Sequence, residues 1–184
     1  MKIKLFLFIV SILFYIKLNA QWIQTNGPYG GNTTAIASNG ADLFATFSYG
    51  KISRSVNNGN SWTDVSNGLS TDPINGITIN GGNLYAATNG SGVYKSVNNG
   101  NSWFQINNGL NSTIVNDIAV SGTTLFAACS NGNSGIYKST NNGGAWTISN
   151  NGMTAQNIQQ IVVNGSNMFA AAYNNGGVYL STDN

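Results

Sequence analysis

Side chains able to carry acid–base or metal chemistry are scarce in this sequence of 184 residues. All five acidic residues are Asp, there is no Glu and no His, and Arg54 and Cys129 are the single Arg and Cys. Glycoside hydrolysis needs two carboxylic acids facing one cleft. Asp72 and Asp117 are candidates for such a pair by position, but no motif surrounds either of them. No His or Cys cluster offers a transition-metal site and no spaced carboxylates offer a calcium loop, so we expect no catalytic residue, no metal and no cofactor.

Tyrosine and asparagine side chains in predicted loops suggest a binding site instead. The candidate ligand-binding residues are Tyr29, Tyr49, Asp72, Asp117 and Asn131, of which Asp117 begins a predicted inner strand. An exposed Tyr ring can stack on a sugar while Asn and Asp bond its hydroxyls. The alternative for each residue is an ordinary solvated loop position.

One eight-residue segment occurs three times in full, and the start of a fourth copy follows. We call each copy a box segment. Ser96–Trp103 reads SVNNGNSW, Ser55–Trp62 reads SVNNGNSW, Ser139–Trp146 reads STNNGGAW, and Ser181–Asn184 has the opening letters STDN. Asn and Gly here favour a hairpin turn, because Asn bonds its own backbone and Gly adopts positive φ without a Cβ clash. The fixed distance from turn to Trp predicts that Trp62, Trp103 and Trp146 are buried in equivalent places. The residues expected to play this structural role are Ser55, Asn57, Gly59, Trp62, Ser96, Asn98, Gly100, Trp103, Ser139, Asn141, Gly143, Trp146, Ser181 and Asp183.

The spacing of the box segments predicts the fold. Their first residues, at positions 55, 96, 139 and 181, are 41, 43 and 42 residues apart, which is a blade-sized period. Each repeat holds four short stretches rich in β-branched and aromatic residues, bounded by Asn-Gly and Gly-Gly turns. The sequence therefore predicts an all-β chain, a β-propeller of four-stranded antiparallel blades. The expected division is an N-terminal strand and link (21–32), three blades (33–66, 67–107 and 108–149) and a partial fourth blade (150–184).

The box segments resemble the Asp-box, or bacterial neuraminidase repeat, of sialidases, sortilin-type receptors, xyloglucanase-type glycosidases and photosystem assembly-factor propellers. Asn replaces the motif's Asp in the three complete copies, and Ala145 stands where the third copy should have Ser or Thr. The resemblance implies that the boxes are structural and that ligands enter from the opposite rim, which carries the candidate residues. A sialidase would require three Arg and a Tyr/Glu pair. Since Arg54 is the only Arg and Glu is missing, that activity is not carried by this chain.

The N-terminus has the layout of a secretory signal peptide over residues 1–20. Lys2 and Lys4 precede an apolar run that is too short to span a membrane, and Ala20 supplies a small residue at the expected cleavage site. An uncleaved anchor is the alternative. After cleavage, four basic residues and five Asp remain, a net charge of −1, so no basic patch is left to attract nucleic acid or anionic lipid. We expect a secreted or cell-surface protein without a membrane span in its mature chain.

Two classes of function fit these observations. The first is a non-catalytic propeller that binds a glycan or an extracellular protein. The second is the N-terminal part of a secreted glycoside hydrolase whose catalytic residues lie largely outside this chain. We expect an incomplete ring with further blades after residue 184. The competing expectation is a closed four-blade ring in which Trp22-Ile23-Gln24, aligned with Trp62-Thr63-Asp64, completes the last blade.

Overall fold

The computed structural model describes residues 22–131, 134–174 and 176–183, so the predicted signal peptide lies outside the described residues. The described residues form fifteen strands, which are joined by turns and links. The first sheet contains β1 (Thr33–Ser38), β2 (Leu43–Phe47), β3 (Ile52–Ser55) and β4 (Thr63–Asp64). The second contains β5 (Ile74–Asn80), β6 (Asn83–Thr88), β7 (Val93–Ser96) and β8 (Phe104–Gln105). The third contains β9 (Ile114–Ser121), β10 (Thr124–Ser130), β11 (Gly135–Ser139) and β12 (Thr147–Ile148), and the fourth contains β13 (Ile158–Asn164), β14 (Asn167–Ala172) and β15 (Gly177–Ser181).

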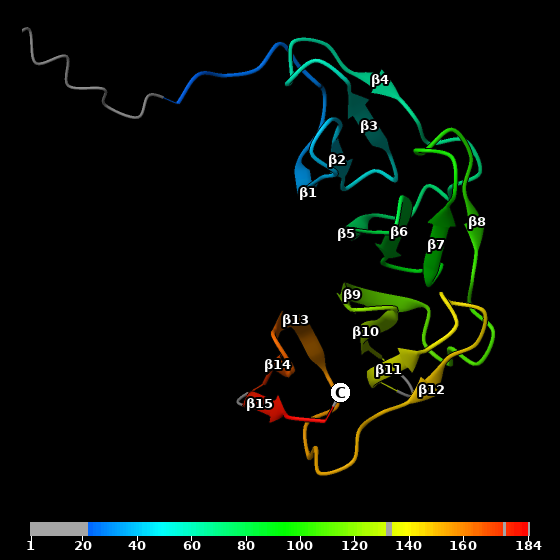
Figure 1. Cartoon of the computed structure of the whole chain (residues 1–184), viewed down its shortest axis with the longest axis vertical. Helices are drawn as coiled ribbons and strands as arrows, with labels where there is room; N and C mark the ends of the chain where they lie inside the picture. The colour runs from blue at the N-terminus through cyan, green and yellow to red at the C-terminus, as the bar shows by residue number, and fades with distance from the viewer. Residues whose placement is uncertain (1–21, 132–133, 175, 184) are drawn as a thin grey trace, which may run out of the picture.

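Each sheet is an antiparallel meander in which consecutive strands are neighbours. The four sheets lie side by side along an arc, with β1, β5, β9 and β13 on its inner side and the short strands β4, β8 and β12 on its outer side (Figure 1). The ring is open between the first sheet and the fourth. The predicted all-β propeller of antiparallel blades is thus confirmed, with the blades forming an open arc.

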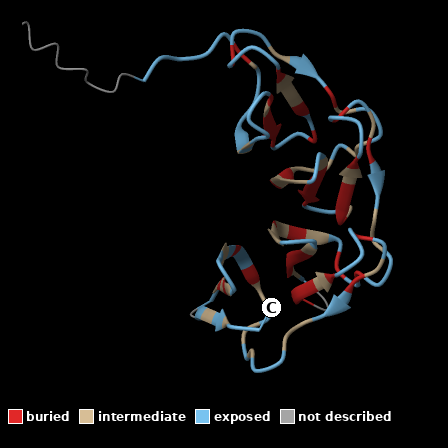
Figure 2. Ribbon diagram, viewed as in Figure 1, coloured by how far each residue is buried: buried red, intermediate tan, exposed pale blue. Residues whose placement is uncertain are grey.

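The hydrophobic core is divided among the gaps between neighbouring sheets (Figure 2). The second strand of each interior sheet is buried on both faces, as in β6, where Tyr85, Ala86 and Ala87 are all inaccessible to solvent. Large and small residues alternate there because each face packs on a different neighbouring sheet. Polar side chains on the inner strands join the sheets further: the Asn75 amide donates to the Val115 carbonyl at 2.9 Å, and that of Asn116 to the Ile158 carbonyl at 2.7 Å.

The box segments form capped turns between the third and fourth strands. In the second copy the Ser96 hydroxyl donates to Asn98 Oδ1 at 3.0 Å and accepts the Gly100 N–H at 2.9 Å. Two consecutive residues take positive φ, Asn99 at 55° and Gly100 at 85°. In the fourth copy the Ser181 hydroxyl donates to Asp183 Oδ1 at 2.9 Å, so the first half of the same turn is formed there.

The box tryptophans are not all equivalent, which corrects the sequence prediction. Trp103 and Trp146 are buried, at 5% and 3% exposure, whereas Trp62 is half-buried. Each buried indole lies against the preceding complete sheet and donates its Nε1–H to a backbone carbonyl there, Trp103 to Val65 at 2.8 Å and Trp146 to Ile106 at 2.6 Å. Trp62 has only residues 22–32 on that side, and its Nε1 finds no partner.

The N-terminal stretch forms no strand among residues 22–32, because no neighbouring strand lies beside it. The fourth strands are the shortest in their sheets: β4, β8 and β12 have two residues each and begin one residue after the box Trp.

Candidate ligand-binding rim and inter-sheet pocket

The rim opposite the box segments is built from the turns between second and third strands and the links between sheets. Each turn is tied to the link that leads into its own sheet. The Ser48 N–H donates to the Asn32 carbonyl at 3.1 Å, the Asn89 N–H to the Pro73 carbonyl at 2.8 Å, and the Tyr173 N–H to the Asn157 carbonyl at 2.9 Å. Backbone hydrogen bonds thus hold this rim in place, and we call it the link rim.

Tyr49 is a partly exposed aromatic residue on the link rim whose position is fixed by contacts with its neighbours. The residue is 42% exposed, and its ring lies 5.3 Å from the Phe47 ring, centroid to centroid. The ring also covers Gly31 so closely that a Cβ at Gly31 would lie 1.9 Å from Tyr49 Cε1, which explains the glycine. Tyr29 lies close by in the chain, more exposed, and its hydroxyl donates to Asn26 Oδ1 at 3.3 Å.

Asp72 lies on the link between the first and second sheets. Its Oδ2 accepts the Ser70 hydroxyl at 3.1 Å and also the Ser91 hydroxyl, which comes from the next turn along the rim. The Tyr49 turn lies against the same link, because a Cβ at Gly50 would lie 2.6 Å from the Thr71 carbonyl carbon. Tyr49 and Asp72 therefore stand on adjoining segments of one surface.

The other two predicted site residues lie apart from this pair. Asn131 is exposed on the turn after β10, with φ of 69°. Asp117 is on the inner strand β9, where Oδ1 accepts the Ile118 N–H at 2.8 Å and Oδ2 accepts the Ile161 N–H at 3.0 Å. Burial raises the pKa of Asp117, against the opposing effect of the two backbone N–H groups. The Oδ2 atom of Asp117 thus joins the third sheet to the fourth, while its Oδ1 atom bonds within β9. The structure therefore pairs Asp117 with the β13 backbone and Asp72 with serine hydroxyls.

Cys129 is fully buried on β10, and its burial raises the pKa of the thiol to about 12. The thiolate is the reactive form of cysteine, so this side chain acts as a small core residue. The residues that the structure describes contain no group of three His, Cys, Asp or Glu placed to hold a metal ion. They also contain no helix long and apolar enough to cross a membrane.

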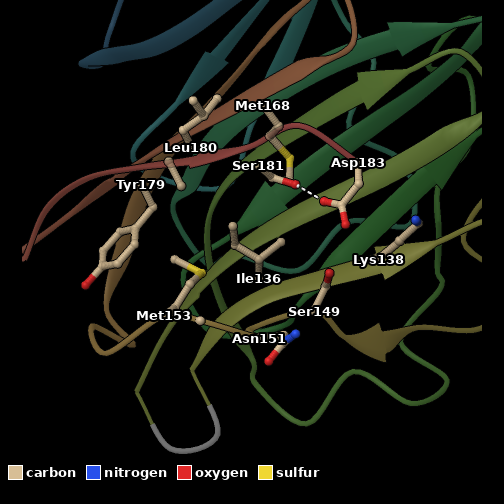
Figure 3. Close-up of a pocket in the computed structure, with 12 residues that line it drawn as sticks. Ile136, Lys138, Ser149, Asn151, Met153, Met168, Tyr179, Leu180, Ser181 and Asp183 are labelled. Atoms are coloured by element: carbon tan, nitrogen blue, oxygen red, sulfur yellow. Dashed lines mark hydrogen bonds between the residues drawn. The ribbon is translucent and has the colours of Figure 1, made fainter.

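A pocket of about 470 Å³, here called the inter-sheet pocket, opens between the third and fourth sheets (Figure 3). Ile136 and Lys138 of β11 lie on one side of it, with Ser149 beyond the end of β12, and Met168 and Tyr179 of the fourth sheet lie on the other. Its mixed lining gives it both apolar walls and hydrogen-bonding groups. The sequence analysis did not predict this pocket. The one feature of the sequence that could have indicated it is Ser149, a small polar residue at the repeat position that Val65 and Ile106 hold in the earlier repeats.

Solved structures with the same architecture are numerous. The computationally designed Ika4 protein matches with a TM-score of 0.69 at 10% identity, over 91% of this chain and 100% of that one. The Niastella koreensis GH74 enzyme matches with a TM-score of 0.62 at 22% identity, over 80% of this chain and 28% of its own. YCF48 bound to D1 peptide matches with a TM-score of 0.65 at 14% identity, over 86% of this chain and 54% of its own. At these identities the likeness shows the fold alone, and this chain spans only part of the GH74 and YCF48 proteins.

A comparison with curated proteins gives no match. The model of the DUF6242 beta propeller domain matches residues 31–150, about two thirds of the chain. This match covers the first three sheets, including all three complete box segments. The chain therefore belongs to the DUF6242 beta propeller domain family.

Proposed function

We propose that this protein is a secreted or cell-surface, non-catalytic propeller of the Asp-box type that binds a glycan or an extracellular protein through its link rim. The observation that carries the proposal is the Tyr49 side chain, which is partly exposed and is held in place by the Phe47 ring and by the backbone at Gly31. A ring held in this way loses little conformational entropy when a ligand covers it.

The surroundings of Tyr49 supply the polar part of such a site. The link that carries Ser70 and Asp72 adjoins the Tyr49 turn, and Ser91 completes a small group of hydroxyls around the Asp72 carboxylate. An aromatic face beside hydroxyl and carboxylate groups suits a sugar ring, which has apolar C–H faces and hydroxyls at its edge. A peptide ligand is the alternative, and YCF48, one of the structural neighbours, is described as bound to a peptide.

A non-catalytic role fits the way in which the carboxylates are engaged. Both oxygens of Asp117 accept backbone N–H groups, so this side chain is committed to joining β9 to β13. Asp72 has only serine hydroxyls around it and no His or Glu to assist in proton transfer. The competing function is a glycoside hydrolase whose catalytic acids lie outside this chain. The similarity to GH74 enzymes supports it only at the level of a shared fold.

The test is a binding screen of the purified protein against arrays of extracellular glycans, with capture of cell-surface proteins in parallel. Once a ligand is found, Tyr49→Ala is expected to weaken its binding at least tenfold, because the stacking surface is removed. Tyr173→Ala is the matched control, since Tyr173 is also an exposed Tyr, at 60% against 42% for Tyr49, and lies on the corresponding turn of the fourth sheet. Unchanged binding by Tyr49→Ala would contradict the proposed site, and cleavage of a bound glycan would favour the hydrolase.

A further inference from the structure

Three polar side chains of the link rim, Ser70, Asp72 and Ser91, form a group that offers hydrogen-bond acceptors, and we call it the acceptor group. The hydroxyl protons of Ser70 and Ser91 are both directed at Asp72 Oδ2. None of the residues that the structure describes donates a hydrogen bond to Asp72 Oδ1. A carboxylate only accepts hydrogen bonds, and a hydroxyl whose proton is engaged has only its lone pairs left. A ligand of the acceptor group must therefore bring the donors itself.

The amide side chains that contact the Ser91 turn are engaged within the fold. Gln105 Nε2 donates to the Ser91 carbonyl at 3.1 Å and to the Tyr94 hydroxyl at 3.2 Å. Asn107 Nδ2 donates to the same Ser91 carbonyl at 2.8 Å, and its Oδ1 accepts the Val93 N–H at 2.8 Å. These amides hold the turn in place, so they leave the acceptor character of the group unchanged.

Gly90 leaves the unbonded oxygen of Asp72 uncovered. Gly90 is exposed, and a Cβ added to it would lie 2.9 Å from Asp72 Oδ1, closer than real side chains approach. Its backbone is fixed there, because the Gly90 N–H donates to the Thr113 carbonyl at 3.0 Å. The half-buried carboxylate is thus held by the serines through one oxygen and can be reached at the other.

The carboxylate is not a general requirement of the repeat. Asp72 precedes Ile77 of β5 by five residues, and the residues at the same distance before the equivalent isoleucines of the other inner strands are Gly31, Thr113 and Gln156. Links of this kind therefore form without an acid at this position. The acceptor group is a local feature of the interior of the arc, between the first and second sheets.

Positive charge is placed away from the acceptor group or is already paired. The basic residues that immediately precede the box segments, and so lie toward the opposite rim, are Arg54, Lys95 and Lys138. Lys51 follows the Tyr49 turn, but its ammonium bonds Asp64 Oδ2 at 2.9 Å on the outer strand β4. An anionic ligand would thus meet the negative charge of Asp72, and the described part of the link rim has no unpaired cation to offset the repulsion.

We propose that the link rim selects uncharged glycans, whose hydroxyls donate to Asp72 Oδ1 and to the Ser91 oxygen while a sugar ring packs on Tyr49. A neutral sugar supplies the donors that the acceptor group needs. A sialylated, sulfated or uronic acid-containing sugar brings an anion that Asp72 repels. This inference rests on the proposed function, namely that the link rim binds a glycan, and it adds the class of glycan.

The experiment is a glycan array printed with neutral glycans and with sialylated, sulfated and uronic acid-containing glycans, probed with protein purified after expression of the full chain. We expect the bound glycans to be neutral. Calorimetric titration of the neutral glycan with the strongest signal should give a Kd that changes less than about twofold between about 50 and about 500 mM NaCl, since no ion pair is screened.

Asp72→Asn tests the acceptor role. It should weaken binding of that neutral glycan at least about tenfold, because the sugar hydroxyls lose a charged acceptor. Asp64→Asn is the charge-matched control, since it also removes one carboxylate, on the exposed outer strand β4, and it should bind like the wild type. Near-UV circular dichroism checks that both variants are folded. Equal binding by the two folded variants would overturn the proposal.

The array also separates this inference from the proposed function. Binding of an acidic glycan that Tyr49→Ala abolishes would overturn the selectivity for uncharged glycans and leave glycan binding at the link rim standing. A Kd that rises steeply with salt would have the same meaning, because it indicates an ion pair with the ligand. An array on which no glycan is bound would overturn both.

Discussion

Asp117 and Asp64 show how the same side chain is used in two opposite electrostatic settings. Asp117 is mostly buried between β9 and β13, and its burial raises the pKa of the carboxyl. Asp64 is exposed at the outer strand β4. Burial is the largest single effect there and would raise the pKa, but the hydrogen bonds from Ser66 and Lys51 together outweigh it, so the pKa of Asp64 is lowered. Neither carboxylate has a partner for proton transfer, and both stabilise the fold through their hydrogen bonds.

The raised pKa of Asp117 predicts a specific dependence of stability on pH. The folded state binds this proton more tightly than the unfolded chain, so the side chain's contribution to the free energy of unfolding is largest below the ordinary pKa of 3.8. It declines as the pH rises through the raised folded-state pKa. Asp117→Asn should lower the free energy of unfolding by about 1–3 kcal/mol at low pH, since one amide oxygen faces two backbone donors. The difference between wild type and variant should shrink toward neutral pH in urea titrations.

Asp64→Asn is the control for that measurement. The lowered pKa of Asp64 gives it the opposite trend, with a stabilising contribution present above pH 3.8 and lost as the pH falls through the folded-state pKa. Its exposed ion pair with Lys51 makes the effect small. A wild-type advantage over Asp117→Asn that grows with pH would contradict the assigned role of burial.

At the scale of the element, the box segment is the unit that the sequence specifies best. Its Asn-Asn-Gly letters predict the turn, and the repeat spacing places the strands on either side, because each feature depends on residues close in the chain. The extent of burial of each Trp could not be predicted in this way. It depends on the sheet that precedes the box, so Trp62 and Trp103 differ although their box segments are identical in sequence.

The serine that begins each box should be the stabilising residue of the turn. In Ser96→Ala the buried N–H of Gly100 loses its acceptor, which should lower the free energy of unfolding by about 1–3 kcal/mol. Ser102→Ala is the matched control, because the third box has Ala145 at that position and keeps its turn. We expect the control to cost about 0.5 kcal/mol or less. Equal losses for the two variants, measured by urea unfolding, would contradict this division of roles.

At the scale of the whole molecule, the arc places two kinds of surface at different locations. The link rim carries Tyr49 and Asp72, whereas the inter-sheet pocket lies between the third and fourth sheets. Sequence reasoning located Tyr49 and Asp72 on one rim because strand alternation fixes which turns share a side. It could not show that they adjoin, since this depends on how the link at Ser70 folds against Gly50. The inter-sheet pocket could not be predicted either, because its shape depends on how the third and fourth sheets pack against each other.

The central claim is that each complete gap between sheets is closed by an indole that donates to the preceding sheet. The most direct test is hydrogen exchange of the four indole N–H groups in 1H–15N NMR spectra, assigned by Trp→Phe variants. In dilute protein we predict strong protection of Trp103 and Trp146, weaker protection of Trp62, whose Nε1 has no acceptor, and free exchange of Trp22. Exchange of Trp103 and Trp146 as fast as that of Trp22 would contradict the account.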